Sequence, residues 1–137
     1  MEREKYISQL AGYFAGCRAE DFDEETRHQV RRCLLDYLGC AVFAAEHRCS
    51  QEFMELIAKL GPGEGKASVW GSKEKLSPML AAFANAVRTS SIEMDDCSGI
   101  GASVHPGVYV MSSALAMWEA QGAAEPQSDC VIYHRFR

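Results

Sequence analysis

Apolar residues recur at helical spacing in two stretches near the start of the chain. Between Tyr6 and Cys17 they fall at positions i, i+3, i+4 and i+7, which places them on one stripe of an α-helix. A second stretch follows the acidic turn 20–23, whose carboxylates suit the beginning of a helix, and it continues to about Ala45. Its last part, residues 39–45, is apolar on every side, as expected where a helix enters the interior of a larger body.

Three shorter helices are predicted downstream. Ser50 can cap a third helix, which the glycine-containing turn 61–63 ends. The pair Ser77–Pro78 combines an N-cap residue with proline at the first helical position, so it predicts the start of a fourth helix. Pro106 opens a fifth helix that stops at Gly122.

The remaining patterned segment is short. Residues 67–71 contain Val and Trp and end at a glycine, which favours an extended or β-like segment. The sequence therefore predicts an all-α fold, a portion of a helical bundle with at most this short extended piece. We assign the helical domain to residues 1–122 and a divergent carboxy-terminal tail, without helical periodicity, to residues 123–137.

Charge and cysteine usage exclude several classes of protein. The chain has 14 Lys and Arg against 19 Asp and Glu, a net charge of −5, which argues against non-specific binding of nucleic acid. The six cysteines form no Cys-x-x-Cys pair, so neither a disulfide framework nor a zinc site is expected. The amino terminus is charged and the longest apolar run, 38–45, is too short to cross a membrane. We expect a cytoplasmic protein that does not bind membranes.

One loop concentrates residues that can carry chemistry: Glu93, Asp95, Asp96, Cys97 and His105. A loop between two packed helices can hold a carboxylate that orients an imidazole, which then moves protons near neutral pH. By residue type alone, the alternative is that the aspartates are solvated cap residues and the histidine an ordinary loop residue. A Cys97–His105 nucleophilic dyad lacks a third member, and a metal site built from the two aspartates and the histidine lacks a helical ligand pair.

Five short motifs add a resemblance to a known family. They are LDYLGCA at 35–41, ASVWG at 67–71, LSP at 76–78 with AAFAN at 81–85, EMDD at 93–96, and HPGV at 105–108. In this order they resemble the amino-terminal part of the MmgE/PrpD family, which includes 2-methylcitrate dehydratase, cis-aconitate decarboxylase and iminodisuccinate epimerase. The resemblance covers about residues 6–122. It implies a mostly helical domain followed by a smaller α+β lid domain, and cofactor-free chemistry on small polycarboxylates.

The resemblance also implies residue roles. His105 matches the active-site histidine of the family's His-Pro motif, a proton donor or acceptor at the carbon beside a substrate carboxylate. Asp95 and Asp96 match the family's paired aspartates, and Glu93 takes the place of the acidic residue two positions ahead of them. Asn85 agrees with the family and is expected to help position the acidic loop.

The chain departs from the family at three places. Cys97 stands where a threonine is often found, Ser90 stands where a histidine often precedes the acidic cluster, and no histidine occurs in residues 98–104. These departures concern the substrate rather than the fold. Arg88 is the nearest candidate cation for a substrate carboxylate, and with Asn85 and Cys97 it completes the candidate substrate-binding set.

The combined expectation is a fragment of a cofactor-independent lyase acting on di- or tricarboxylates. An epimerase of the same family and a non-catalytic helical interaction module are the alternatives. No metal or organic cofactor is expected. The family's substrate-binding lysines lie beyond the matched region, and residues 123–137 resemble nothing in it, so we expect a truncated chain without measurable turnover. Apolar helix faces left uncovered by such truncation predict a homo-oligomer.

Overall fold

The structure is a computed structural model that describes residues 2–61, 65–99 and 104–122. The predicted turn around 62–63, the middle of the acidic loop, the tail 123–137 and its Cys130 lie outside these residues. The helices are α1 (Glu2–Gly16), α2 (Glu24–Ala44), α3 (Arg48–Leu60), α4 (Pro78–Ser90) and α5 (Pro106–Ala120), with a 3-10 turn at Ala19–Asp21. The all-α prediction is confirmed, because the described strands are only β1 (Ala67–Ser68) and β2 (Lys75–Leu76).

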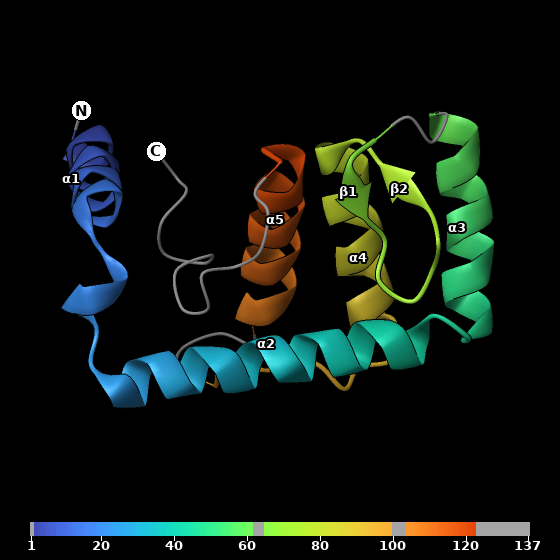
Figure 1. Cartoon of the computed structure of the whole chain (residues 1–137), viewed down its shortest axis with the longest axis horizontal. Coiled ribbons are helices and arrows are strands. Elements are labelled where there is room, and N and C mark those ends of the chain that lie inside the picture. Colours follow the sequence, from blue (N-terminus) through green and yellow to red (C-terminus); the bar gives the residue numbers. More distant parts are fainter. Residues whose placement is uncertain (1, 62–64, 100–103, 123–137) are drawn as a thin grey trace.

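Helix α4 is the central element of the molecule. It packs against α5 most extensively, and it also contacts α2, α3 and both strands. Figure 1 shows α2 running along one side of the molecule, with α3, α4 and α5 standing on it. Helix α1 stands on the same side of α2 as these helices, near the beginning of α2. It does not pack extensively against any other described element.

The core consists of two buried apolar clusters. The larger one lies between α3, α4, α5 and the hairpin, and its members are Ile57, Ala67, Val69, Leu76, Ala81, Ala84 and Ala116. Its many alanines let the helix backbones approach closely. The second cluster joins α2 to α5 through Tyr37, Met111 and Leu115. The Tyr37 hydroxyl lies 2.8 Å from Ser112 Oγ, so this buried phenol is hydrogen-bonded rather than left unsatisfied.

Two predicted helix caps are confirmed and one is wrong. Asp23 caps α2 by accepting the Thr26 N–H at 2.7 Å, and Ser77 caps α4 with Pro78 in the first turn. Helix α3 instead begins at Arg48, with His47 at the N-cap position. Ser50 lies inside that helix, 1% exposed, because its hydroxyl accepts a hydrogen bond from Arg88, 38 positions away.

The extended segment predicted at 67–71 is confirmed at Ala67–Ser68, which pairs antiparallel with Lys75–Leu76. The second strand was not predicted, because two residues are too short to show a period. The all-round apolar end of α2 is only half covered: Cys40, Ala41 and Ala44 are buried, while Val42 and Phe43 are 54% and 66% exposed. Within the described ranges, no helix combines the length and apolarity needed to cross a bilayer.

We predict that Ser77→Ala lowers the free energy of unfolding by about 1 kcal/mol, because it removes the side-chain acceptor for the Leu80 N–H at the start of the central helix. Urea denaturation followed by circular dichroism measures this change. Ser77→Thr keeps a capping oxygen and should lose clearly less. Equal loss in both variants would contradict the capping role.

Candidate active site

The acidic loop is shaped by local backbone structure at both ends. Where α4 ends, the chain turns through Glu93, whose φ of 53° lies in the left-handed region. Further on, Ser98 and Val104 form an isolated antiparallel bridge, in which the Ser98 N–H donates to the Val104 carbonyl at 2.9 Å. This bridge folds the loop back on itself. Residues just before 98 therefore lie beside residues just after 104, at the start of α5.

The loop brings Asp95 and His105 together. Asp95 Oδ2 lies 2.9 Å from His105 Nδ1, and the carboxylate side chain is 2% exposed while the imidazole is 32% exposed. Neither Asp95 oxygen accepts an aligned hydrogen bond from the described residues, so the 2.9 Å approach is a close contact without hydrogen-bond geometry. A buried carboxylate beside a partly accessible imidazole is an arrangement suited to general acid–base chemistry.

Asp96 has a different partner from its neighbour. Both of its carboxylate oxygens accept the N–H of Gly107, at 2.9 and 3.1 Å. Gly107 is the second residue of α5, so the carboxylate satisfies a free helix N–H and lies at the positive end of the helix dipole. The two aspartates of the motif therefore divide their contacts: Asp95 approaches His105, and Asp96 anchors the loop to the helix that His105 precedes.

Glu93 and Cys97 are both exposed on this loop. No hydrogen bond joins Cys97 to His105 among the described residues, and the Cys97 thiol is free. The geometry thus gives the alternative Cys97–His105 dyad no support. The catalytic role of Glu93 and the substrate-binding role of Cys97 stay predictions.

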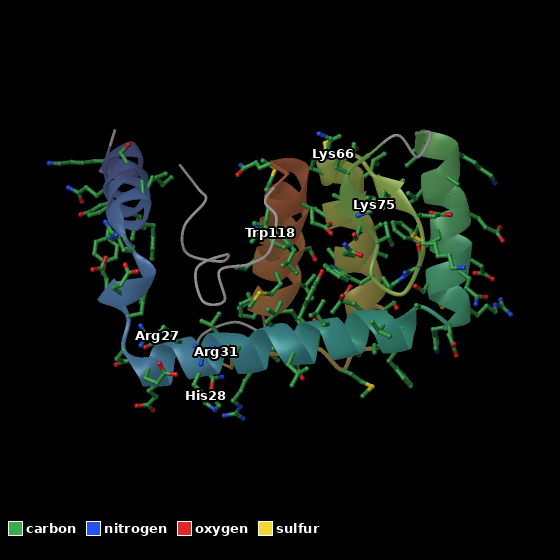
Figure 2. All side chains as sticks on the ribbon, in the orientation of Figure 1. Arg27, His28, Arg31, Lys66, Lys75 and Trp118 are labelled. Atoms are coloured by element: carbon green, nitrogen blue, oxygen red, sulfur yellow. The ribbon has the colours of Figure 1, made fainter. Side chains whose placement is uncertain are left out.

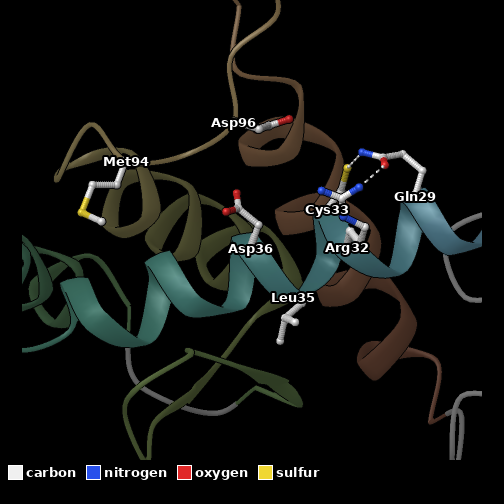
Figure 3. Close-up of a pocket in the computed structure, with 7 residues that line it drawn as sticks. All are labelled: Gln29, Arg32, Cys33, Leu35, Asp36, Met94 and Asp96. Carbon is white, nitrogen blue, oxygen red and sulfur yellow. Dashed lines mark hydrogen bonds between the residues drawn. The ribbon is translucent and has the colours of Figure 1, made fainter.

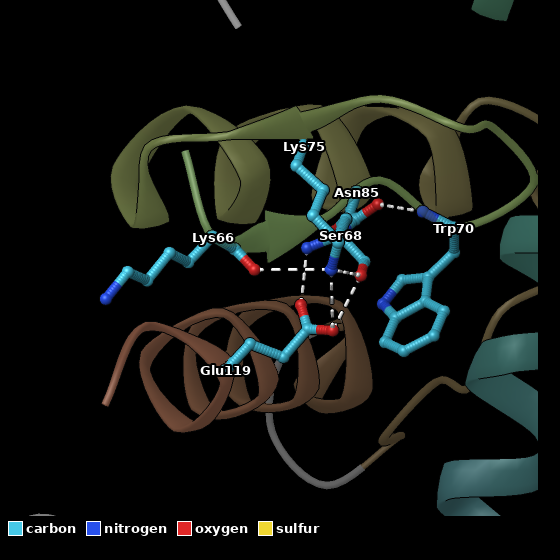
Figure 4. A network of polar contacts seen from close by, with 6 residues as sticks. All are labelled: Lys66, Ser68, Trp70, Lys75, Asn85 and Glu119. Atoms are coloured by element: carbon cyan, nitrogen blue, oxygen red, sulfur yellow. Dashed lines mark hydrogen bonds and ion pairs between the residues drawn. The ribbon is translucent and has the colours of Figure 1, made fainter. Parts of the chain in front are cut away.

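Asn85 holds a strand rather than the acidic loop, contrary to the expectation from the sequence. Its side-chain Oδ1 accepts the Trp70 N–H at 2.9 Å, and its Nδ2 donates to the Ser68 carbonyl at 2.9 Å, as Figure 4 shows. The residue is 1% exposed. Its amide therefore fastens the segment after β1 to α4.

Arg88 is also committed to the interior. It is 3% exposed, its Nε donates to Ser50 Oγ at 2.9 Å, and one terminal nitrogen donates to the Trp70 carbonyl. Burial lowers the pKa of the guanidinium, and the negative charge of Glu74 partly offsets that effect. In this structure Arg88 joins α4 to α3 and to the strand segment, and it presents almost no surface to a dissolved carboxylate.

The labelled basic residues in Figure 2 gather in two other places. Arg27 and Arg31 lie on the first half of α2, where the Glu24 carboxylate pairs with both, at 2.9 and 3.0 Å. Lys75, on β2, lies on the hairpin beside α5, where it donates to Ser68 Oγ at 2.9 Å.

The Lys75 contact belongs to a polar network that sequence reasoning missed. The Glu119 carboxylate near the end of α5 accepts both the backbone N–H and the hydroxyl of Ser68, and it lies 3.9 Å from Lys75 Nζ (Figure 4). Residues 68 and 119 are too far apart in sequence for any spacing to predict the pairing. The network fastens the hairpin to α5, so Lys75 is engaged away from the acidic loop.

A pocket of about 520 Å³ lies between α2 and the acidic loop (Figure 3). Its lining residues are Gln29, Arg32, Cys33, Leu35, Asp36, Met94 and Asp96. The acidic loop lines this pocket through Met94 and Asp96, whereas His105 adjoins the loop through Asp95 and is not among the lining residues.

In the part of the chain that the structure describes, no group of three or more His, Cys, Asp or Glu side chains is placed to hold a metal ion. The five described cysteines are free thiols. The expectation that the protein binds no metal or cofactor stays a prediction, to be tested by elemental analysis of the purified protein.

The fold and the loop define a helical domain with a carboxylate–imidazole pair at the start of a helix. Residues 8–131 match the sequence model of the MmgE/PrpD N-terminal domain, and the chain belongs to the MmgE/PrpD family. The matched range contains the whole acidic loop and His105, and it extends past residue 122 into the segment that we assigned to a tail. No individual curated protein shows significant similarity to the chain.

We predict that Gly107→Ala destabilises the protein by about 1 to 2 kcal/mol. A Cβ at this position would lie 2.6 Å from Asp96 Oδ1, so the carboxylate must move and lose its charge-assisted hydrogen bonds. Gly39→Ala is the matched control: nothing lies within 4 Å of its added Cβ, and helix propensity should raise stability by about 0.5 to 1 kcal/mol. Urea denaturation of both variants decides the matter, and a neutral Gly107→Ala would contradict the anchoring role of Asp96.

We also predict that Glu93→Asn raises stability by about 0.5 to 1 kcal/mol. Asn tolerates the left-handed conformation that Glu93 adopts, whereas other residues with a Cβ are strained there. Glu93→Ala retains the Cβ and should bring no such gain. Thermal unfolding of the two variants gives the comparison, and a stabilised Ala variant would show that relief of backbone strain is not the cause.

Proposed function

We propose that this chain supplies the acid–base part of a cofactor-independent lyase acting on small di- or tricarboxylates, of the 2-methylcitrate dehydratase or cis-aconitate decarboxylase type. The observation that carries the proposal is the 2.9 Å approach of the buried Asp95 carboxylate to Nδ1 of the partly exposed His105. Membership of the MmgE/PrpD family supports it. Both residues occupy the positions where the family's motif has its paired aspartates and its active-site histidine.

The chemistry follows from this pair. Asp95 lies beside Nδ1 of the imidazole, which leaves Nε2 as the nitrogen that can exchange a proton with a substrate. In a dehydration, His105 takes the proton from the carbon beside a carboxylate, and the hydroxyl group on the neighbouring carbon leaves as water once it is protonated. In a decarboxylation, it delivers the proton that replaces carbon dioxide. The epimerase alternative uses the same proton abstraction, with the proton returned on the opposite face.

A polycarboxylate also needs cations or hydrogen-bond donors that hold its carboxylates in place. Arg88, the candidate from the sequence, is buried and bonded to Ser50 and Trp70. Lys75 is bonded to Ser68 beside Glu119. Arg88 and Lys75 are thus both engaged within the fold, and we expect low activity of the chain by itself.

A second candidate function is a non-catalytic helical interaction module. The observation that favours it is α1, whose apolar residues Tyr6, Ile7, Leu10, Tyr13 and Phe14 are each more than half exposed. Such a face is typical of a surface that another chain or another copy covers. A homo-oligomer located in the cytoplasm is compatible with either function, and sedimentation of the purified chain measures the oligomeric state.

We predict no measurable turnover of 2-methylcitrate, cis-aconitate or iminodisuccinate by the chain alone. Among the described residues Arg88 and Lys75 are bonded within the fold, and each charge-stabilising donor that a substrate cannot reach lowers the rate by about 10² to 10³. Where the genomic sequence immediately downstream continues the family, the chain joined to it should be active. In that protein His105→Asn should lower kcat/KM by about 10² to 10⁴, since it removes the proton-transferring group. Spectrophotometric assay of substrate loss measures both forms.

His28→Asn is the matched control, because His28 is an exposed histidine on α2, outside the acidic loop. Robust turnover by the chain alone would contradict the argument from missing cations. Full activity of the His105→Asn variant would eliminate the acid–base proposal. Downstream sequence unrelated to the family would favour the interaction module instead.

A further inference from the structure

The pocket between α2 and the acidic loop has a size suited to a small molecule. Its volume of about 520 Å³ lies in the range of ordinary ligand sites, about 300 to 1,000 Å³. One wall comes from α2, with Gln29, Arg32 and Asp36, and the opposite wall comes from the loop, with Met94 and Asp96 (Figure 3). Arg32 lies outside the family motifs, Asp36 lies within the first of them at 35–41, and the proposed reaction uses neither side chain.

Arg32 and Asp36 lie four positions apart on α2, a spacing at which opposite charges usually pair. Here they do not. The Arg32 guanidinium reaches only the side-chain oxygen of Gln29, at 3.4 Å, and no described carboxylate pairs with it. The Asp36 carboxylate makes no hydrogen bond or ion pair within the described residues, and Figure 3 shows it directed toward the loop wall. A cation and an anion therefore both line the pocket without neutralising each other.

The negative charge is concentrated on the Asp36 side of the pocket. Asp96 stands on the facing wall, where it holds the Gly107 N–H. Asp36 and Asp96 thus line one region of the pocket from opposite walls, and after burial the charges of Asp36, Asp95 and Asp96 also raise the pKa of the Cys40 thiol. That region repels anions and attracts cations, whereas Arg32 does the reverse.

A simple ion would satisfy only part of this pocket. A carboxylate bound to Arg32 would lie near two aspartates, and a metal cation bound between the aspartates would leave the guanidinium without an anion. A molecule with an ammonium group beside a carboxylate satisfies both, because the ammonium can lie between Asp36 and Asp96 while the carboxylate pairs with Arg32 in the fork geometry that guanidinium favours. Met94, 63% exposed at the edge of the pocket, offers an apolar surface to an aliphatic side chain.

We infer that this pocket is a binding site for a zwitterionic α-amino acid with an aliphatic side chain, held by Arg32 at its carboxylate and by Asp36 and Asp96 at its ammonium group. The site goes beyond the proposed lyase function, since it uses α2 and needs no proton transfer by His105.

The test measures binding to the purified chain by isothermal titration calorimetry with three matched probes. L-Leucine carries both charged groups, 4-methylpentanoate lacks the ammonium group, and 3-methylbutylamine lacks the carboxylate. We expect L-leucine to bind at least about tenfold more tightly than either analogue, because each charge-assisted contact contributes about one factor of ten or more. Arg32→Gln and Asp36→Asn should each weaken L-leucine binding by about tenfold or more.

Two further variants control for charge alone. Arg31→Gln and Glu25→Gln make the same charge changes on α2 at residues that do not line this pocket, and they should leave L-leucine binding unchanged. Arg32 and Asp36 are both exposed, so their variants should fold normally, which circular dichroism checks.

Three results would overturn the inference. Equal binding of 4-methylpentanoate and L-leucine would show a simple anion site, and displacement of L-leucine by Mg²⁺ would show a cation site. Absence of any L-leucine binding up to about 10 mM would show that the pocket takes no amino acid of this kind. Because no turnover is measured, each result is independent of whether the chain acts as a lyase.

Discussion

The close packing of α4 against α5 is the contact on which the rest of the molecule depends. Ala81 and Ala84 on α4 and Ala116 on α5 are almost fully buried, and their small side chains let the two helix backbones approach. The acidic loop joins these same two helices. Fixing α4 and α5 therefore fixes both ends of the loop. Because core packing already holds these ends, ordering the loop costs less additional conformational entropy.

The conformation of the acidic loop reflects a balance between backbone strain at Glu93 and hydrogen bonding at Asp96. Glu93 in the left-handed region costs about 1 kcal/mol or more of backbone strain. The single Gly107 N–H, shared between both oxygens of the Asp96 carboxylate, contributes about 1.5 to 3 kcal/mol in the opposite direction, since the acceptor is charged and lies at a helix N-terminus. The bridge between Ser98 and Val104 then determines which residues meet. Asp96 is fixed to the Gly107 N–H at the start of α5. Asp95, its neighbour in the loop, is thereby held close to His105, the residue that precedes α5.

The sequence predicted those features that depend on neighbours along the chain. Helical periods and the caps at Asp23 and Ser77 are local, and the structure contains them. The prediction that Ser50 caps α3 was wrong because its hydroxyl accepts a hydrogen bond from Arg88, a buried residue of α4. Local sequence around Ser50 gives no sign of this distant partner. In the candidate site, the short loop made the approach of Asp95 and His105 predictable. The bonds of Asn85 to residues near β1 could not be predicted, since they depend on how the hairpin lies on α4.

The charge of the acidic loop constrains what its histidine can do. Asp95 is almost fully buried and has no aligned hydrogen-bond donor, so its negative charge is poorly screened. A substrate carboxylate about 4 Å from such a charge would be repelled by about 4 kcal/mol at the effective dielectric of a protein surface. A polycarboxylate therefore stays beside this loop only where cations hold its carboxylates. In the residues that the structure describes, Arg88 is enclosed by its own hydrogen bonds, so the proposed proton transfer at His105 would need carboxylate-binding groups other than Arg88.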